Sequence, residues 1–217
     1  MSIRVVLADD HRMIREGLRL LLDQAPDVIV VGEADTGRQA VRLAGNLTPD
    51  VLVMDISMPD LNGIEATRRI KTASPQVKVI ALSMYSDRRY VLGMFEAGAS
   101  GYIVKAGAGD ELVRAVRAVN RNRKYLSPEI AGILVDDVLG GRSAPKHSAF
   151  GVLSSREREV LQLLAEGSTS PQIAGSLHIS VKTVEAHRRN LMKKLDLHSV
   201  AELTKYAVRE GLTSLDA

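Results

Sequence analysis

The sequence predicts a doubly wound α/β domain with a five-stranded parallel sheet, followed by a small all-α domain. Three observations lead to this fold class. Five short apolar runs alternate with helical patterns over the first 120 residues, as in sheets built from βα units with right-handed crossovers. A polar or charged residue follows most of these runs. After about residue 150, short helical patterns are joined by tight turns, which favours a helix-turn-helix arrangement.

Composition limits the function classes. The 217 residues suit one large or two small domains. No apolar run is long enough to span a bilayer and no signal peptide is recognisable, so we expect a cytoplasmic protein without a membrane partner. The absence of cysteine excludes disulfides and thiolate chemistry. A net charge of +3 is too small to indicate nucleic-acid binding by itself.

The five apolar runs are the predicted strands, and the segments between them have helical spacing. Leu112, Ala115, Val116 and Val119, for example, follow an i, i+3, i+4, i+7 pattern. Helices are therefore expected on both faces of the sheet, and the predicted strands span residues 3–8, 28–33, 51–54, 77–82 and 101–104.

The third run has the composition of a strand that is buried on both faces. It is apolar from Val51 to Met54 and ends at Asp55, and Pro59 prevents regular pairing soon afterwards. A carboxylate is thus expected at the carboxyl end of a central strand, which is where open α/β sheets bind their ligands.

Other strand ends carry reactive groups as well. The first run is followed by Asp9 and Asp10, the fourth by Ser83 and the fifth by Lys105. In a 2-1-3-4-5 strand order, three carboxylates meet at one crevice, opposite a hydroxyl and an ammonium group. Such carboxylates repel one another and need a cation, and oxygen-only ligands suit Mg²⁺ or Mn²⁺. A carboxylate nucleophile beside such an ion can accept a phosphoryl group, whose oxygens Ser83 and Lys105 could hold. No glycine-rich phosphate loop follows the first strand, which disfavours a dinucleotide or P-loop site.

These residues belong to an ordered set of motifs. The segment resembles the receiver domain of two-component response regulators, which has a flavodoxin-like fold. The matching pieces are Ala8-Asp9-Asp10-His11, Met54-Asp55-Ile56-Ser57-Met58-Pro59, Asn62-Gly63, Ala81-Leu82-Ser83 and Gly98-Ala99-Ser100-Gly101-Tyr102-Ile103-Val104-Lys105.

The resemblance implies a role for each matched residue. It implies that Asp55 is the phosphoacceptor and that Mg²⁺ is bound by Asp10, Asp55 and the backbone carbonyl of Ser57, with Asp9 acting mostly through water. It also implies that Ser83 and Tyr102 rearrange on phosphorylation.

Two matched positions have a second interpretation or a different role. His11 is expected to start a helix rather than bind the metal. Tyr102 could alternatively be a simple aromatic residue on an edge strand.

The domain boundary is expected where the composition changes. Ser127-Pro128 favours the start of a short helix that extends to about Leu139. Residues 140–148 are polar and contain two glycines, as in a flexible linker. The predicted division is a first domain over residues 1–122, a linker with a short helix over 123–148, and a second domain over 149–217.

Capping signals divide the last 65 residues into helices. Ser154 and Glu157 fit a capping box, and Gly167 ends the first helix. A second helix starts at Ser170-Pro171 and turns at His178-Ile179, Ser180 caps the third, and a fourth starts near Ser199.

The third helix separates apolar from basic positions. Val184, Leu191 and Leu195 share one face. Residues 182–194 contain five basic residues and one acidic residue, whereas residues 148–217 contain nine basic and eight acidic ones. Charge concentrated on one helix is what contact with DNA phosphates requires, although an ordinary solvated helix face has the same pattern.

This part of the chain also carries motifs of a family. It resembles the LuxR-type helix-turn-helix in the segments Leu153-Ser154-Ser155-Arg156-Glu157-Arg158-Glu159-Val160-Leu161, Ile173-Ala174 and Ile179-Ser180-Val181-Lys182-Thr183-Val184-Glu185-Ala186-His187. With the first domain, the whole chain resembles a response regulator of the NarL/FixJ class. The implied DNA-binding residues are Lys182, Thr183, Glu185, Ala186, Arg188, Arg189 and Lys193. Two departures stand out: Ser170-Pro171 replaces a common Asn-Lys, and Glu185 stands where many members have lysine.

The expected function is that of a DNA-binding transcription regulator of a two-component system, not an enzyme acting on a separate substrate. The resemblance implies phosphorylation of Asp55 by a sensor histidine kinase, which promotes homodimerisation and binding to promoter DNA, with RNA polymerase as a further partner. One alternative is an aspartyl-phosphate phosphatase, but Ser57 stands where those enzymes usually have a second aspartate. Another is an adaptor whose receiver is not phosphorylated.

Overall fold

The computed structural model describes residues 2–84, 86–132 and 152–213. The chain divides into two compact units, residues 1–142 and 143–217, and each is described separately. None of the helices in the described part of the chain is both long and apolar enough to cross a lipid bilayer.

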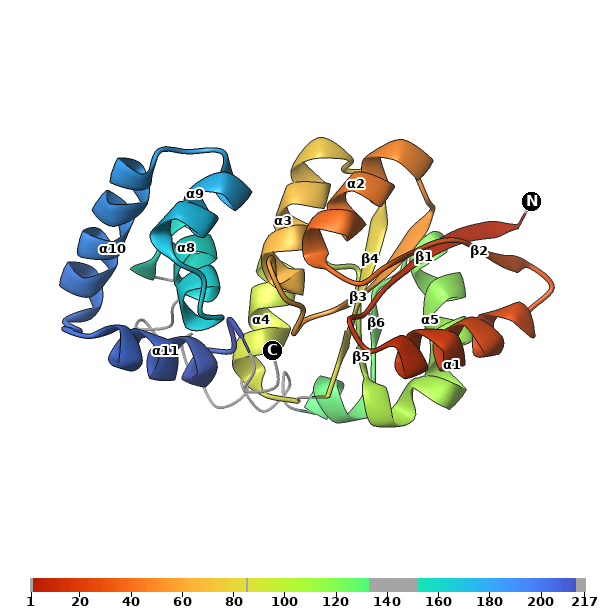
Figure 1. The fold of residues 1–217 in the computed structure, drawn as a ribbon. Coiled ribbons are helices and arrows are strands. Elements are labelled where there is room, and N and C mark those ends of the chain that lie inside the picture. Colours follow the sequence, from red (N-terminus) through yellow and green to blue (C-terminus); the bar gives the residue numbers. More distant parts are fainter. Residues whose placement is uncertain (1, 85, 133–151, 214–217) are drawn as a thin grey trace. The chain divides into compact units, whose positions relative to one another are not determined.

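The N-terminal unit contains a parallel sheet in the order β2-β1-β3-β4-β5-β6 (Figure 1). The predicted order of the first five strands is confirmed, but the prediction of five strands was wrong, because Tyr125–Leu126 (β6) pairs with β5. Two residues are too few to show a strand pattern in the sequence. The other strands are β1 (Ile3–Ala8), β2 (Val28–Ala34), β3 (Val51–Asp55), β4 (Lys78–Ser83) and β5 (Gly101–Val104).

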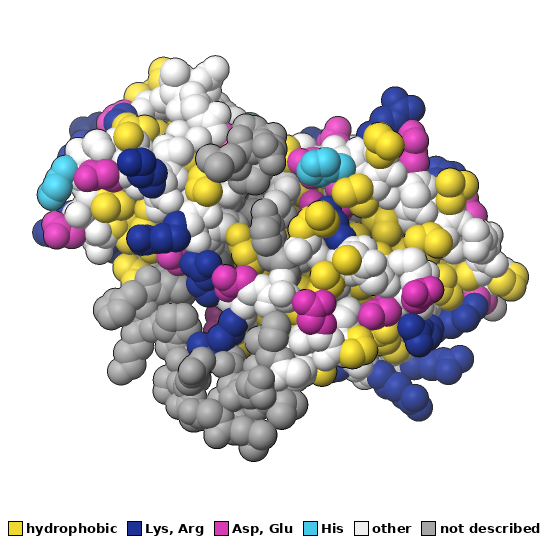
Figure 2. Space-filling view, turned by 90° about the horizontal axis from the view of Figure 1, so that it is seen from below, with side chains coloured by type: hydrophobic (Ala, Val, Ile, Leu, Met, Phe, Trp, Pro, Cys, Tyr) yellow, Lys and Arg dark blue, Asp and Glu magenta, His cyan; other side chains and the backbone are white. Residues whose placement is uncertain are grey.

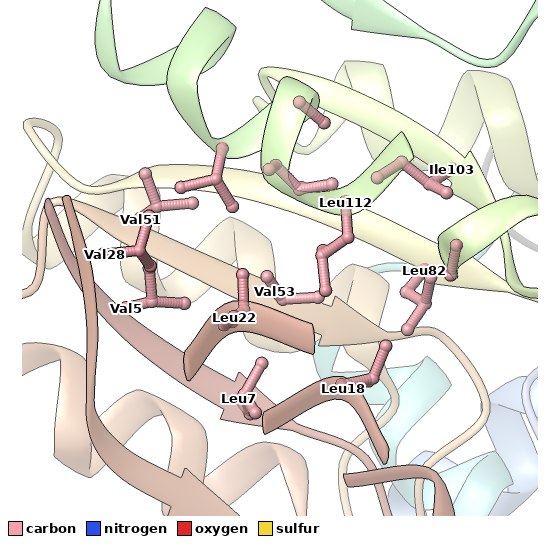
Figure 3. Close-up of a cluster of buried hydrophobic side chains, with 14 of the residues drawn as sticks. Val5, Leu7, Leu18, Leu22, Val28, Val51, Val53, Leu82, Ile103 and Leu112 are labelled. Atoms are coloured by element: carbon pink, nitrogen blue, oxygen red, sulfur yellow. The ribbon is translucent and has the colours of Figure 1, made fainter. Parts of the chain in front are cut away.

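Helices cover both faces of this sheet, as predicted. The helices α1 and α5 lie on one face, and α2, α3 and α4 lie on the other (Figure 1). Leu18 and Leu22 of α1 and Leu112 of α5 pack on Val5 and Val53 (Figure 3). Burying a leucine side chain contributes about 1.5–3 kcal/mol, so this face is a main source of stability. The helices are α1 (Arg12–Asp23), α2 (Gly37–Leu47), α3 (Gly63–Ala73), α4 (Arg88–Glu96) and α5 (Ala108–Asn120), with a 3₁₀ turn, η1 (Lys105–Gly107), before α5.

The segment after β6 begins a helix where the sequence predicts one. Ser127 precedes helical residues from Pro128 to 132, at the end of the described range. The Ser127 hydroxyl donates a hydrogen bond to Glu111 Oε2 at 2.6 Å, and its backbone N–H bonds the Tyr102 carbonyl at 3.0 Å. The predicted helix end near Leu139 and the polar linker over 140–148 lie outside the described residues.

The C-terminal unit contains four described helices whose ends follow the predicted signals. The capping box of Ser154 with Glu157 starts α8, and Gly167, at φ +84°, follows its end. His178 ends α9 in the left-handed region, and the Ser180 side chain caps α10. Ile173, Val184, Leu191 and Leu203 are among the buried residues that join these helices. The helices are α8 (Ser155–Ala165), α9 (Ser170–Leu177), α10 (Val181–Leu195) and α11 (Val200–Arg209).

Candidate functional site

The ends of β1 and β3 bring the three predicted carboxylates together. Asp9 and Asp10 follow β1, and Asp55 is the last residue of β3. Ligand atoms of Asp9, Asp10, His11 and Asp55 all lie within 4.8 Å of one another. Parallel strands in adjacent positions end at the same edge of the sheet, which is why residues 46 positions apart meet here.

Lys105 lies between two of these carboxylates. Its Nζ is 2.7 Å from Asp9 Oδ2 and 2.9 Å from Asp55 Oδ2, and only 7% of its side chain is exposed. Burial lowers the pKa of Lys105, but the two carboxylates outweigh this effect and hold the pKa above its usual value. The lysine is therefore a fixed positive charge between Asp9 and Asp55.

Asp55 is 3% exposed, and its environment disfavours its charged form. Burial raises its pKa, Lys105 lowers it, and Asp9 and Asp10 raise it again, so that the pKa lies at about 6. An added divalent cation would favour the ionised form. At neutral pH the carboxylate is still mostly deprotonated and can act as a nucleophile.

The raised pKa of Asp55 predicts a pH dependence of folding in protein freed of divalent ions by EDTA. Because the folded-state pKa lies above the unfolded value, ionisation favours unfolding, and stability is lost as pH rises from about 4 through 6. The loss should approach roughly 3 kcal/mol above pH 7. Asp55→Asn should therefore unfold at higher urea concentration than the wild type at pH 8. The difference should disappear near pH 4, and Asp35→Asn, at an exposed position, should show no such trend. An advantage for Asp55→Asn that did not change between pH 4 and 8 would contradict the assignment.

The loop after β3 holds the Asp55 backbone against α3. The Gly63 N–H donates to the Ile56 carbonyl at 2.8 Å, and the Asn62 side chain caps the helix by accepting from Glu65 N–H. A Cβ at Gly63 would lie 2.0 Å from the Asp55 carbonyl oxygen. In the sequence, Asn62-Gly63 appears only as part of a motif. The structure shows why glycine is needed there, because any larger residue at position 63 would displace the backbone of Asp55.

Ser83 and Tyr102 lie within the unit rather than on its surface. Ser83 is 1% exposed and Tyr102 is fully buried. Burial raises the pKa of Tyr102, and a hydrogen bond with the Ser83 side chain partly offsets the increase. The alternative of an edge-strand aromatic is wrong, because β5 lies between β4 and β6.

His11 lies beside the carboxylates, and Ser57 follows Asp55 by two residues in the chain. His11 is the N-cap residue of α1, as predicted, and its backbone N–H donates to Asp9 Oδ1 at 2.9 Å. Its exposed ring places Nδ1 2.8 Å from Asp10 Oδ1, a contact that the sequence did not indicate. Ser57 lies in the bend after β3 and is partly exposed.

In the C-terminal unit, α10 buries one face and presents the other. Val184 and Leu191 are buried. The predicted DNA-contact residues are all solvent-accessible: Lys182, Thr183, Arg189 and Lys193 are exposed, and Glu185, Ala186 and Arg188 are partly exposed.

Lys194 differs from the other basic residues of α10. Its Nζ lies 2.8 Å from Oε2 of Glu157, which is 5% exposed and belongs to the capping box of α8. Burial raises the pKa of Glu157, but the bonds from Lys194 and Ser154 outweigh it and hold the pKa below its usual value. Lys194 therefore joins two helices and is less available to a ligand than its neighbours.

The surface seen in Figure 2 mixes acidic, basic and apolar side chains. A single field of positive charge, which would attract any polyanion, does not dominate this view. The net charge of the full sequence is also small, at +3.

Comparisons with known proteins match both units. Residues 5–117 match the family "Response regulator receiver domain", and residues 151–207 match "Bacterial regulatory proteins, luxR family". Oxygen regulatory protein NreC of Staphylococcus carnosus (strain TM300) is 38% identical over 214 residues, covering 97% of this chain and 99% of that protein. Transcriptional regulatory protein LiaR of Bacillus subtilis (strain 168) is 38% identical over 213 residues, covering 98% of this chain and all of that protein. The structure of RcsB from Salmonella enterica serovar Typhimurium, bound to promoter rprA in the presence of the phosphomimetic BeF₃⁻, has a TM-score of 0.62 and 28% identity, covering 95% of this chain and 98% of that chain.

Proposed function

Because this chain belongs to the DNA-binding two-component response regulators, which join a receiver domain to a luxR-family domain, we propose that phosphorylation of Asp55 by a sensor histidine kinase switches its binding to promoter DNA. The observation that carries this proposal is the buried Asp55 carboxylate, 2.9 Å from the Lys105 ammonium in a group of acidic side chains. The proposed domains are a receiver over residues 1–122, a linker over 123–148 and a DNA-binding domain over 149–217.

The proposed chemistry uses the crevice residues directly. An Asp55 oxygen attacks the phosphorus of a phosphohistidine, so that a P–O bond forms, the P–N bond breaks and the histidine leaves. Lys105 neutralises charge on the phosphoryl oxygens. Asp10, Asp55 and the Ser57 carbonyl, with Asp9 acting through water, would hold Mg²⁺ or Mn²⁺, and their all-oxygen donor set fits such an ion. When bound, the ion supplies further positive charge for the phosphoryl group. We propose no reaction beyond the receiver's own phosphorylation and dephosphorylation.

The proposed switch begins at Ser83, which now bonds to Tyr102. A phosphoryl oxygen on Asp55 would compete for the Ser83 hydroxyl, and Tyr102 would adjust to its loss. Both side chains are buried, so their movement must be transmitted to the packing around β5 and α4. The phosphorylated receiver would then form a homodimer that supports promoter binding.

The switch predicts a change of assembly state. Beryllofluoride with Mg²⁺ should shift the protein from monomer toward dimer. The coupling free energy between occupation of the phosphoryl position on Asp55 and dimerisation should be about 1–3 kcal/mol. Sedimentation across a concentration series measures this shift, and Asp55→Asn should not respond. Unchanged mass and unchanged DNA affinity in the wild type would contradict the mechanism.

The proposed DNA-binding mode places α10 in the major groove, with α11 at the contact between two DNA-bound copies. A dimer then requires two related half-sites. We further propose that the protein acts in the bacterial cytoplasm and works with RNA polymerase. The RcsB structure bound to promoter rprA supports DNA binding by this architecture.

Substitutions on α10 should separate base reading from phosphate contact. Arg189→Ala should cost roughly 1–3 kcal/mol on the true site and relax one base position, because Arg can grip guanine. Lys193→Ala should weaken all sequences alike and reduce the salt dependence. Titrations on single-base variants of a site selected from genomic fragments, at two salt concentrations, measure both effects. If Arg189→Ala weakened every variant by the same factor, Arg189 would be a phosphate contact.

A further inference from the structure

The two departures from the LuxR-type pattern meet in the structure. Ser170 is the first residue of α9 and Glu185 lies on α10. The Ser170 hydroxyl donates a hydrogen bond to Glu185 Oε1. Arg188 Nη1 lies 3.5 Å from the same oxygen. Contacts from two helices thus restrain a carboxylate that is 39% exposed on the face proposed to read DNA.

These contacts restrict the direction of the Glu185 side chain. A free glutamate samples several rotamers, and ordering it at an interface weakens binding. Both contacts use Oε1, so Oε2 keeps its capacity to accept a hydrogen bond. The Arg188 charge also offsets the repulsion between the carboxylate and nearby DNA phosphates.

We infer that Ser170 is a positioning residue for sequence readout, holding Glu185 so that Oε2 accepts a hydrogen bond from the amino group of a cytosine. This inference rests on the proposed function, in which α10 enters the major groove. A carboxylate only accepts hydrogen bonds, so it disfavours the acceptor edges of guanine and thymine. Adenine offers an amino group too, but its neighbouring N7 is an acceptor and repels the second carboxylate oxygen.

The Ser170 hydroxyl is not needed to start α9. Thr169 is the N-cap residue and forms the capping box with Gln172. The backbone N–H of Thr169 donates to Gln172 Oε1 at 2.8 Å. Ser170→Ala should therefore keep the fold and lower the melting temperature by at most a few degrees, because it removes one hydrogen bond between α9 and α10 and no helix cap. Its effect on DNA can then be read without a folding defect.

The test measures binding of the full chain, with beryllofluoride and Mg²⁺ present, to single-base variants of the DNA site selected from genomic fragments. Glu185→Ala first identifies the base pair that Glu185 reads. Ser170→Ala should reduce the preference for cytosine at that pair by about three- to tenfold and leave other positions unchanged. Ser170→Thr keeps a hydroxyl and should retain the preference. Ser176→Ala removes an exposed hydroxyl from the same helix and serves as the matched control.

The double variant gives the decisive comparison. In a Glu185→Ala background, Ser170→Ala should have no further effect. If it keeps its full effect there, or weakens all sites equally, Ser170 contacts phosphate and the inference is wrong. It is also wrong if Glu185→Ala relaxes no base pair, or if Ser170→Ala leaves the cytosine preference unchanged while the wild type still binds selectively. A wild type without any selective binding would instead contradict the proposed function.

Discussion

Asp55→Asn should gain no phosphoryl group from acetyl phosphate and Mg²⁺, whereas the wild type should gain one. The substitution keeps the shape of the side chain but removes the nucleophilic carboxylate, so the expected loss is complete. Intact-mass measurement over a time course shows the result directly. Omitting Mg²⁺ should abolish the gain in the wild type as well.

Asp35→Asn is the matched control for this experiment. Asp35 follows β2 and is exposed, so its replacement should leave the mass gain at the wild-type level. An equal gain in Asp55→Asn would place the phosphoacceptor elsewhere and contradict the assignment.

Gly63→Ala should have the second large effect, on both stability and phosphorylation. A Cβ at this position would lie 2.0 Å from the Asp55 carbonyl oxygen and 3.0 Å from Ile56 Cα. These are backbone atoms that cannot rotate away, so we expect the free energy of unfolding to fall by about 3 kcal/mol or more. The displaced Asp55 should also accept phosphate more slowly, because small errors in position weaken catalysis. Urea unfolding and the mass time course measure the two effects.

Gly17→Ala is the control, because it adds a Cβ to a glycine where that atom has space. Gly17 lies within α1, and a Cβ there would have no atom within 4 Å. Alanine should stabilise this helix by about 0.5–1 kcal/mol. A Gly63→Ala protein as stable as Gly17→Ala would show that the loop after β3 can move away from α3, contrary to the close packing described here.

Features that depend on neighbouring residues or on a regular pattern could be predicted from the amino-acid sequence. The buried run ending at Asp55 identified a central strand, and the repeated βα units predicted a parallel sheet covered by helices. The 2-1-3-4-5 order expected for the first five strands is confirmed. The capping box at Ser154 and the helix stop at Gly167 could be recognised because they use residues only a few positions apart. The convergence of Asp9, Asp10 and Asp55 was predictable because parallel strands end at one edge.

Contacts between side chains that are far apart in the sequence became visible only in the folded structure. Lys194 resembles a DNA-contacting lysine in the sequence, but it pairs with Glu157 across 37 residues. Ser170 and Glu185 appeared as separate departures, yet they share a hydrogen bond. The pairing of β6 with β5 and the close approach of Gly63 to Asp55 likewise depend on how the elements pack. A strand of two residues, such as β6, is too short to leave a periodic pattern in the sequence. The contact of Gly63 with the Asp55 carbonyl leaves no pattern either, so both features appear only when packing brings the partners together.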